Sequence, residues 1–115
     1  MSGLAGKAAI VTGGGGGIGA ATAHELARAG AAVAVVDIDE AKAVAVVDEI
    51  RRTGAQAIAL GGDLSEEQTA GQVVRSTVSE FGRLDVLHNN AALTTSSFLS
   101  RDTTVSEMAD RKSVV

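Results

Sequence analysis

Five consecutive glycines, residues 13–17, constrain this chain of 115 residues more than any other feature. They follow an apolar run at residues 8–11, which predicts a buried strand, and precede residues 20–29, which predict a helix ending at Gly30. Glycines let the backbone turn tightly and come close to a ligand. Such a turn leaves the first amides of the helix, with the positive end of its dipole, facing an anion. The sequence therefore predicts a phosphate-binding turn, and a glycine loop without a ligand is the alternative.

The rest of the chain alternates predicted strands and helices without a repeat or a linker, which indicates a single domain over residues 1–115. The predicted strands cover residues 7–11, 32–37, 55–60 and 84–89. The predicted helices cover residues 17–29, a segment after Asp39 that runs to Arg52, and a segment after Ser65 that ends at Gly82. Alternation of this kind with right-handed crossovers predicts an α/β Rossmann-type parallel sheet, in the order 3-2-1-4, with helices on both faces.

Helix caps and buried stripes follow from the same pattern. Asp39 is expected to cap the second helix, and Ser65 with Gln68 is expected to form a capping box for the third. The residues expected to be buried at helical spacing are Val44, Val47 and Ile50 in the second helix, and Val73, Val74, Thr77, Val78 and Phe81 in the third.

Composition narrows the range of partners. The net charge of −4 provides no basic patch, which argues against nucleic acid or an anionic membrane as a partner. No apolar run approaches the length of a membrane span, and the N-terminus lacks the regions of a signal peptide. The chain contains no cysteine, so disulfides and thiolate metal sites are excluded. A cytoplasmic protein is the default expectation.

Four motifs occur in an order and spacing that resemble the short-chain dehydrogenases/reductases. The first is the Thr-Gly-x-x-x-Gly-x-Gly turn, filled by Thr12, Gly13, Gly17, Ile18 and Gly19. Asp37 after the second strand, Asp63 with Leu64 after the third, and residues 81–91 around the fourth complete the set. The resemblance covers nearly the whole chain but only the first half of a family domain, which implies an NAD-binding portion that stops before strand five.

This resemblance implies the cofactor NAD and a role for each motif. The glycine turn would hold the pyrophosphate, and Asp37, followed by Ile38, would accept hydrogen bonds from the adenosine ribose. An acid at this position accompanies NAD rather than NADP in the family, since a carboxylate repels a 2′-phosphate by about 4 kcal/mol per charge pair at an intermediate dielectric. Asp63 and Leu64 would hold the adenine ring. Asn89 and Asn90 would tie the central strands together. Beside Asn90, the backbone of Ala91 and Ala92 would line the ribose, with Ala92 standing where the family has glycine.

Structural explanations compete with several of these roles. Asp37 is also explained as a turn or cap residue, and Asp63 as a turn acid. His24 and His88 fit a packing or surface role better than a catalytic one, because neither has the neighbours of a triad or a metal site.

The family's catalytic tyrosine has no counterpart, because the chain contains no tyrosine, and its serine, lysine and supporting asparagine are not matched either. We therefore expect the NAD-binding half of an alcohol- or ketone-specific oxidoreductase, without catalytic residues of its own. Two alternatives remain open. The missing half could come from another chain, or the chain could be a self-associating remnant without a specific ligand. The edge of the fourth strand, which pairs with a fifth strand in relatives, predicts a homo-oligomer.

Overall fold

The computed structural model describes residues 3–90, and these form four strands and three helices in strict alternation. In chain order, the elements are β1 (Ala8–Thr12), α1 (Gly17–Arg28), β2 (Ala32–Asp37), α2 (Glu40–Arg52), β3 (Ala57–Gly61), α3 (Glu67–Phe81) and β4 (Val86–Asn89). The predicted elements are confirmed, with ends that differ by one or two residues.

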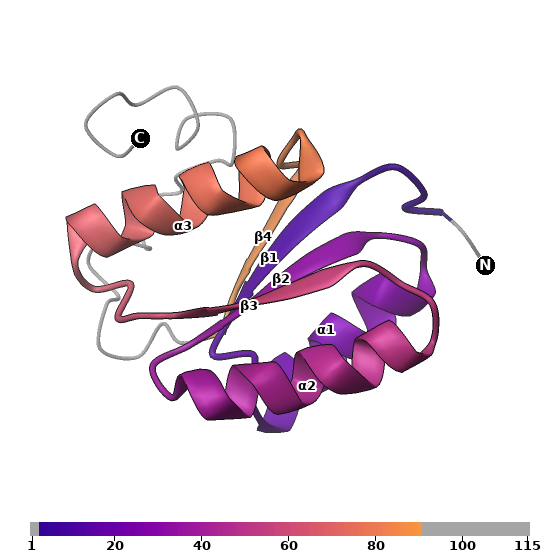
Figure 1. Cartoon of the computed structure of the whole chain (residues 1–115), viewed down its shortest axis with the longest axis horizontal. Coiled ribbons are helices and arrows are strands. Elements are labelled where there is room, and N and C mark those ends of the chain that lie inside the picture. Colours follow the sequence, from indigo (N-terminus) through magenta and orange to yellow (C-terminus); the bar gives the residue numbers. More distant parts are fainter. Residues whose placement is uncertain (1–2, 91–115) are drawn as a thin grey trace.

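The strands form one parallel sheet in the order β3-β2-β1-β4, as predicted. In the register of the central pair, Ala8 lies opposite Ala32 and Thr12 lies opposite Val36, while β4 pairs with β1 through Ala9 and Val86. Helices α1 and α2 cover one face of the sheet and α3 covers the other (Figure 1). The architecture is therefore the Rossmann-type arrangement predicted from the sequence.

Alternation along the strands divides the apolar residues between two cores. Val11, Val33 and Val35 face α1 and α2, where the helices contribute small or branched residues such as Ala23 and Val47. Their neighbours along the strands face α3, and the members of this second core are Ile10, Ala34, Val36, Val73 and Val74. The two central strands, β1 and β2, are apolar on both faces and almost wholly buried, as expected for a parallel sheet.

One predicted position in each of α2 and α3 is wrong. Val44 and Val78 are exposed, with 42% and 38% of their surface accessible. The buried stripe of α2 instead consists of Ala43, Val46, Val47 and Ile50, which follow the i, i+3, i+4, i+7 spacing of one helical face. Val44 and Val78 each come one residue after a buried position, a rotation of about 100° around the helix that carries them out of the core.

The helix caps agree with the prediction at α2 but not at α3. Asp39 caps α2, since its Oδ1 accepts a hydrogen bond from the Ala41 amide at 3.2 Å. The capping box of Ser65 and Gln68 is not formed, because α3 begins after Glu66 and that residue makes no side-chain cap. The Ser65 amide donates instead to Asp63 Oδ1 at 2.9 Å, so Asp63 closes a local turn ahead of the helix.

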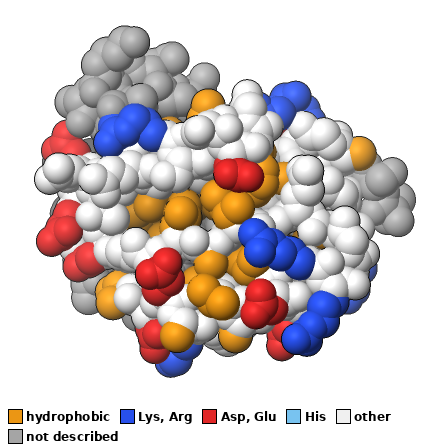
Figure 2. All heavy atoms as spheres, viewed as in Figure 1, with side chains coloured by type: hydrophobic (Ala, Val, Ile, Leu, Met, Phe, Trp, Pro, Cys, Tyr) orange, Lys and Arg blue, Asp and Glu red, His pale blue; other side chains and the backbone are white. Residues whose placement is uncertain are grey.

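The two outer parts of the sheet differ in their surroundings. Hydrophobic side chains show in the furrow between α2 and α3, where β3 is the outer strand (Figure 2). Part of this furrow is a cavity of about 290 Å³ lined by Ile58, Phe81 and Glu80, among others. On the other side, β4 pairs with β1 alone among the described residues, and its residues are half-buried.

No helix within residues 3–90 is long and apolar enough to span a bilayer.

Candidate functional site

The glycine turn connects β1 to α1 at the carboxyl ends of the strands, next to the point where the strand order reverses between β1 and β4. Gly13 and Gly17 have φ values of +62° and +57°, which residues with a Cβ atom rarely adopt. Gly19 has a different requirement. A Cβ at Gly19 would overlap the carbonyl oxygen of Gly13, so only glycine lets α1 lie this close to the turn. The three glycines of the motif are therefore fixed by the geometry of the turn itself.

The N-terminus of α1 has no internal cap. Gly16 at the N-cap position makes no side-chain hydrogen bond, and the first turn contains no acidic residue. The first amides of a helix have no partner within the helix, so those of Gly17, Ile18 and Gly19 can donate to a group placed at this end of α1. By contrast, α2 has the Asp39 cap and Glu40 in its first turn. The arrangement at α1 suits an anionic group placed above the turn.

A buried threonine ties the turn to β4. The Thr12 hydroxyl, 1% exposed, donates to Asn89 Oδ1 and accepts a hydrogen bond from the Asn90 amide, both at 3.0 Å. The side-chain amide of Asn90 also lies 3.5 Å from the Gly13 carbonyl oxygen. These contacts hold the carboxyl ends of β1 and β4 together at the point where the strand order reverses. The tie between the central strands that the resemblance implies for the asparagines is thus present, and Thr12, named in the sequence only as part of the motif, is its partner in β1.

Asp37, at the end of β2, lies beside the glycine turn. Its Oδ2 accepts a hydrogen bond from the Gly15 amide at 3.0 Å, across 22 positions of sequence. Its Oδ1 accepts another from the Asp39 amide at 2.9 Å, so Asp37 also closes the turn before α2. Ile18 and Ile38 are 73% and 74% exposed, the largest exposures among the large hydrophobic residues described. Ile18 follows Gly17 in the turn and Ile38 follows Asp37, so exposed apolar surface lies beside the turn and the carboxylate.

Asp63 and Leu64 follow β3 and differ in orientation. Asp63 is exposed, and hydrogen bonds from the backbone and side chain of Ser65 lower its pKa below the ordinary value of an aspartate. It is therefore ionised at neutral pH, with Oδ1 bonded to the Ser65 amide. The Leu64 side chain instead packs against the core beneath α3. This turn fits either an adenine contact or a structural role for Asp63.

The remaining predicted positions separate into two groups. Ala91 and Ala92 lie outside the described residues. His24 on α1 bridges to α2, with Nε2 lying 3.0 Å from Glu49 Oε1, and His88 is half-buried within β4. No cluster of metal-ligating side chains occurs within residues 3–90.

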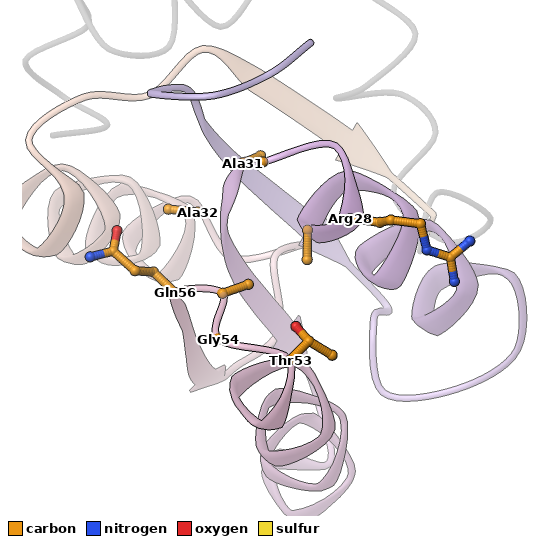
Figure 3. A pocket seen from close by; sticks show the side chains of 9 residues that line it. Arg28, Ala31, Ala32, Thr53, Gly54 and Gln56 are labelled. Atoms are coloured by element: carbon orange, nitrogen blue, oxygen red, sulfur yellow. The ribbon is translucent and has the colours of Figure 1, made fainter. Parts of the chain in front are cut away.

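A cavity of about 540 Å³ lies at the opposite end of the sheet, where β2 begins and α1 and α2 end (Figure 3). It is lined largely by small residues such as Ala31, Ala32 and Gly54. The Arg28 side chain extends away from Thr53 and Gly54, and its guanidinium pairs with Glu25 at 3.0 Å. The other polar side chains that line the cavity are Thr53 and Gln56, and the cavity lies at the opposite end of the sheet from the glycine turn.

Comparison with known proteins identifies this arrangement. Residues 7–113 match the family described as short chain dehydrogenase. The chain belongs to the short chain dehydrogenase family. The resemblance inferred from the four motifs is thereby confirmed, and the strand order agrees with the Rossmann-type fold of this oxidoreductase family.

Several relatives are more than 40% identical to the chain over the residues that align. An uncharacterised oxidoreductase of Methylorubrum extorquens is 49% identical over 94 residues, covering 81% of this chain and 38% of that protein. The 7alpha-hydroxysteroid dehydrogenase of Escherichia coli K12 is 46% identical over 88 residues, covering 76% and 34%. The chain therefore spans about a third of the length of the curated relatives it matches.

Solved structures agree with the sequence comparison. A crystal structure of hydroxysteroid dehydrogenase from Escherichia coli superposes with a TM-score of 0.73 at 44% identity, over 75% of this chain and 37% of that one. A 7 alpha-hydroxysteroid dehydrogenase complexed with NADH and 7-oxo glycochenodeoxycholic acid gives a TM-score of 0.71 at 44% identity, over 73% and 33%. A relative of the same fold thus binds NADH.

Proposed function

We propose that this chain forms the adenosine- and pyrophosphate-binding part of the NAD site of a short chain dehydrogenase. The observation that carries the proposal is the uncapped N-terminus of α1, packed onto the turn through Gly19 and lying beside the carboxylate of Asp37. The residues fit the cofactor, because the anion site and the ribose acceptor are adjacent, with exposed apolar surface at Ile18 and Ile38 next to them. Of the cofactors of this family, NAD suits the carboxylate at Asp37.

Each motif then has a role in holding the dinucleotide. The pyrophosphate accepts hydrogen bonds from the amides of Gly17, Ile18 and Gly19, in the turn that begins at Gly13. Asp37 accepts hydrogen bonds from the hydroxyls of the adenosine ribose. The adenine ring lies near Ile38, Asp63 and Leu64. Asn90 lines the ribose from the side of β4, and the family resemblance assigns the same role to Ala91 and Ala92. These assignments rest on the family resemblance together with the positions of the described residues.

NAD supplies hydride-transfer chemistry when it is bound, and the whole protein is proposed to exchange a hydride with an alcohol or ketone. The relative bound to NADH and a 7-oxo bile acid supports this reaction class. The 115-residue chain contains no tyrosine that could donate or accept the substrate proton. Positioned acid–base groups typically contribute a factor of about 100 to 10,000 in rate. The isolated polypeptide should therefore show no NAD-dependent turnover above the buffer blank. We propose the cytoplasm as the location of the protein.

A self-associating form is the second candidate, and the pairing of β4 supports it. Among the described residues, β4 hydrogen-bonds to β1 on one side, and a free strand edge recruits another strand. We propose a homo-oligomer in which this edge is covered by a neighbouring copy. Light scattering at tens of micromolar should show a dimer or a larger assembly, and a monodisperse monomer would count against it.

Titration calorimetry with NAD, ADP-ribose and NADP tests the binding proposal. If the chain recognises the adenosine side alone, ADP-ribose should bind about as tightly as NAD, and NADP should bind more weakly than either. Asp37→Ala should narrow the gap between NAD and NADP, because the carboxylate that repels the 2′-phosphate is removed. Equal binding of NAD and NADP, or a clear gain from the nicotinamide ring, would refute the half-site proposal.

A further inference from the structure

The Asp37 carboxylate is held from two sides before any ligand is present. The Gly15 amide donates to Oδ2 at 3.0 Å, and the Asp39 amide donates to Oδ1 at 2.9 Å. Each carboxylate oxygen offers two lone pairs, so one on each oxygen remains to accept a ligand hydroxyl. The two backbone donors come from opposite sides of Asp37 in the sequence, and together they fix the plane of the carboxylate.

Gly15 is constrained by Asp37 and α2, not by its own backbone angles. It is not among the residues with a positive φ. A Cβ at Gly15 would lie 2.8 Å from Asp37 Oδ2 and 2.6 Å from the Cβ of Lys42, both too close for real contacts. Any side chain at this position would have to push the carboxylate away from the Gly15 amide. The absence of a side chain therefore allows the hydrogen bond that orients Asp37.

The next glycine provides a natural contrast. Gly16 has a φ of −170°, an extended conformation that any residue adopts, and a Cβ there would meet no heavy atom within 4 Å. Alanine at Gly16 should therefore fit without moving Asp37. Two neighbouring glycines of one turn thus differ in whether they touch the residue proposed to select the cofactor.

We propose that Gly15 is a positioning residue for cofactor selectivity, which it sets by orienting the Asp37 carboxylate toward the adenosine ribose. This inference rests on the proposed NAD site and assigns Gly15 a role beyond the three motif glycines. Gly15 acts through Asp37, to which its amide donates a hydrogen bond. Replacing it should therefore change the preference between ribose variants of the cofactor more than it changes affinity for the pyrophosphate.

The test compares Gly15→Ala and Gly16→Ala by calorimetry with NAD, NADP and NAD that lacks the adenosine 2′-hydroxyl. Losing a hydrogen bond to a charged group lowers binding affinity by about tenfold or more. We expect Gly15→Ala to reduce the NAD-to-NADP affinity ratio by about tenfold and to make the 2′-deoxy compound bind nearly as well as NAD. Gly16→Ala should leave both ratios at the wild-type value.

The outcomes separate the two proposals. If the wild-type chain prefers NAD but Gly15→Ala keeps both ratios, the role of Gly15 is wrong while the NAD site stands. If the wild-type chain binds none of the dinucleotides, the proposed function itself fails. Should Gly15→Ala not fold, the amide proton of Gly15 provides a second test, because Asp37→Asn should shift its NMR resonance upfield while leaving that of Gly16 in place. An unchanged Gly15 resonance would overturn the inference.

Discussion

The N-termini of α1 and α2 lie at the same end of the sheet, yet their amides are satisfied in opposite ways. At α2, the Asp39 side chain accepts a hydrogen bond from the Ala41 amide, and Glu40 places an acid in the first turn. At α1, no side chain caps the helix and no acid occupies the first turn. The same helix dipole is thus neutralised by the chain itself at α2 and left without an internal anion at α1.

This difference indicates that the proposed anion site exists because α1 lacks the capping side chain and the first-turn acid that α2 has. A helix with glycine at the N-cap, as at Gly16, loses only a few tenths of a kcal/mol relative to one capped by Ser, Asp or Asn. At α1 that cost coincides with the glycines that let the backbone approach a ligand. At α2 nothing comparable is present, because its first turn is already occupied by Asp39 and Glu40. The predictions below exchange or remove these features.

The largest effect should follow from giving α1 the acid that α2 has. Ile18→Asp places a carboxylate among the free amides, at a position where 73% of the side chain is exposed and little packing is lost. It should leave stability unchanged or raise it by up to about 1 kcal/mol, because an acid suits a helix N-terminus. Dinucleotide affinity should fall by at least about tenfold, since the carboxylate repels the pyrophosphate. Thermal unfolding and calorimetry measure the two effects.

Two matched variants control this experiment. Ile18→Asn removes the same apolar surface without the charge, so it should lose much less affinity than Ile18→Asp. Val44→Asp adds the same charge at an exposed position of α2 and should leave binding unchanged. If all three variants bind equally, the N-terminus of α1 is not the anion site.

A smaller effect is expected at the bridge that supports the turn. Thr12→Val keeps the shape of the side chain but removes the hydroxyl that joins Asn89 and the Asn90 amide. Leaving buried polar partners unsatisfied should destabilise the fold by about 1–3 kcal/mol, as measured by chemical denaturation. Thr12→Ser retains the hydroxyl and should recover most of this loss. Equal stability of the valine variant and the wild type would show that the bridge contributes nothing.

The smallest effect should come from the cap of α2. Asp39→Ala removes the acceptor for the Ala41 amide and should cost about 1 kcal/mol of stability. Asp39→Asn should be nearly neutral, because asparagine caps as well as aspartate. Affinity for NAD should stay at the wild-type value in both, since the Asp39 backbone amide still holds Asp37. A tenfold loss of NAD affinity in Asp39→Ala would make α2 part of the site.

The order of elements was predictable because each has a strong local signal. The apolar runs, the Asp39 cap and the glycines that follow each helix were all read correctly from sequence. Gly54 and Gly82 have φ values of +92° and +83°, as expected after the end of a helix. The predictions failed where neighbouring residues compete for the same hydrogen bond or the same buried position. Asp63 takes the Ser65 amide that a capping box would need, and Val44 gives way to the smaller Ala43 in the packed stripe.

The positions of the candidate site residues were predictable only from the motif spacing. The resemblance implied that the asparagines tie the central strands together, but contacts between distant residues carry no local signal. The part of Thr12 in that tie and the packing of Gly15 against Asp37 and Lys42 were therefore not predicted. Both involve partners that come together only once the sheet is assembled. The motif indicates which residues belong to the turn, while the fold determines how each one is held.

The most direct test of the account is to map NAD onto the chain by NMR, following every backbone amide as NAD is added to saturation. The account predicts that the largest changes occur at Gly17, Ile18 and Gly19, with further changes at Asp37 and Asp63, and that the amides around the cavity at Ala31 and Gly54 stay in place. Changes centred on that cavity, or an unchanged spectrum at millimolar NAD, would contradict the claim that the open N-terminus of α1 is a dinucleotide site.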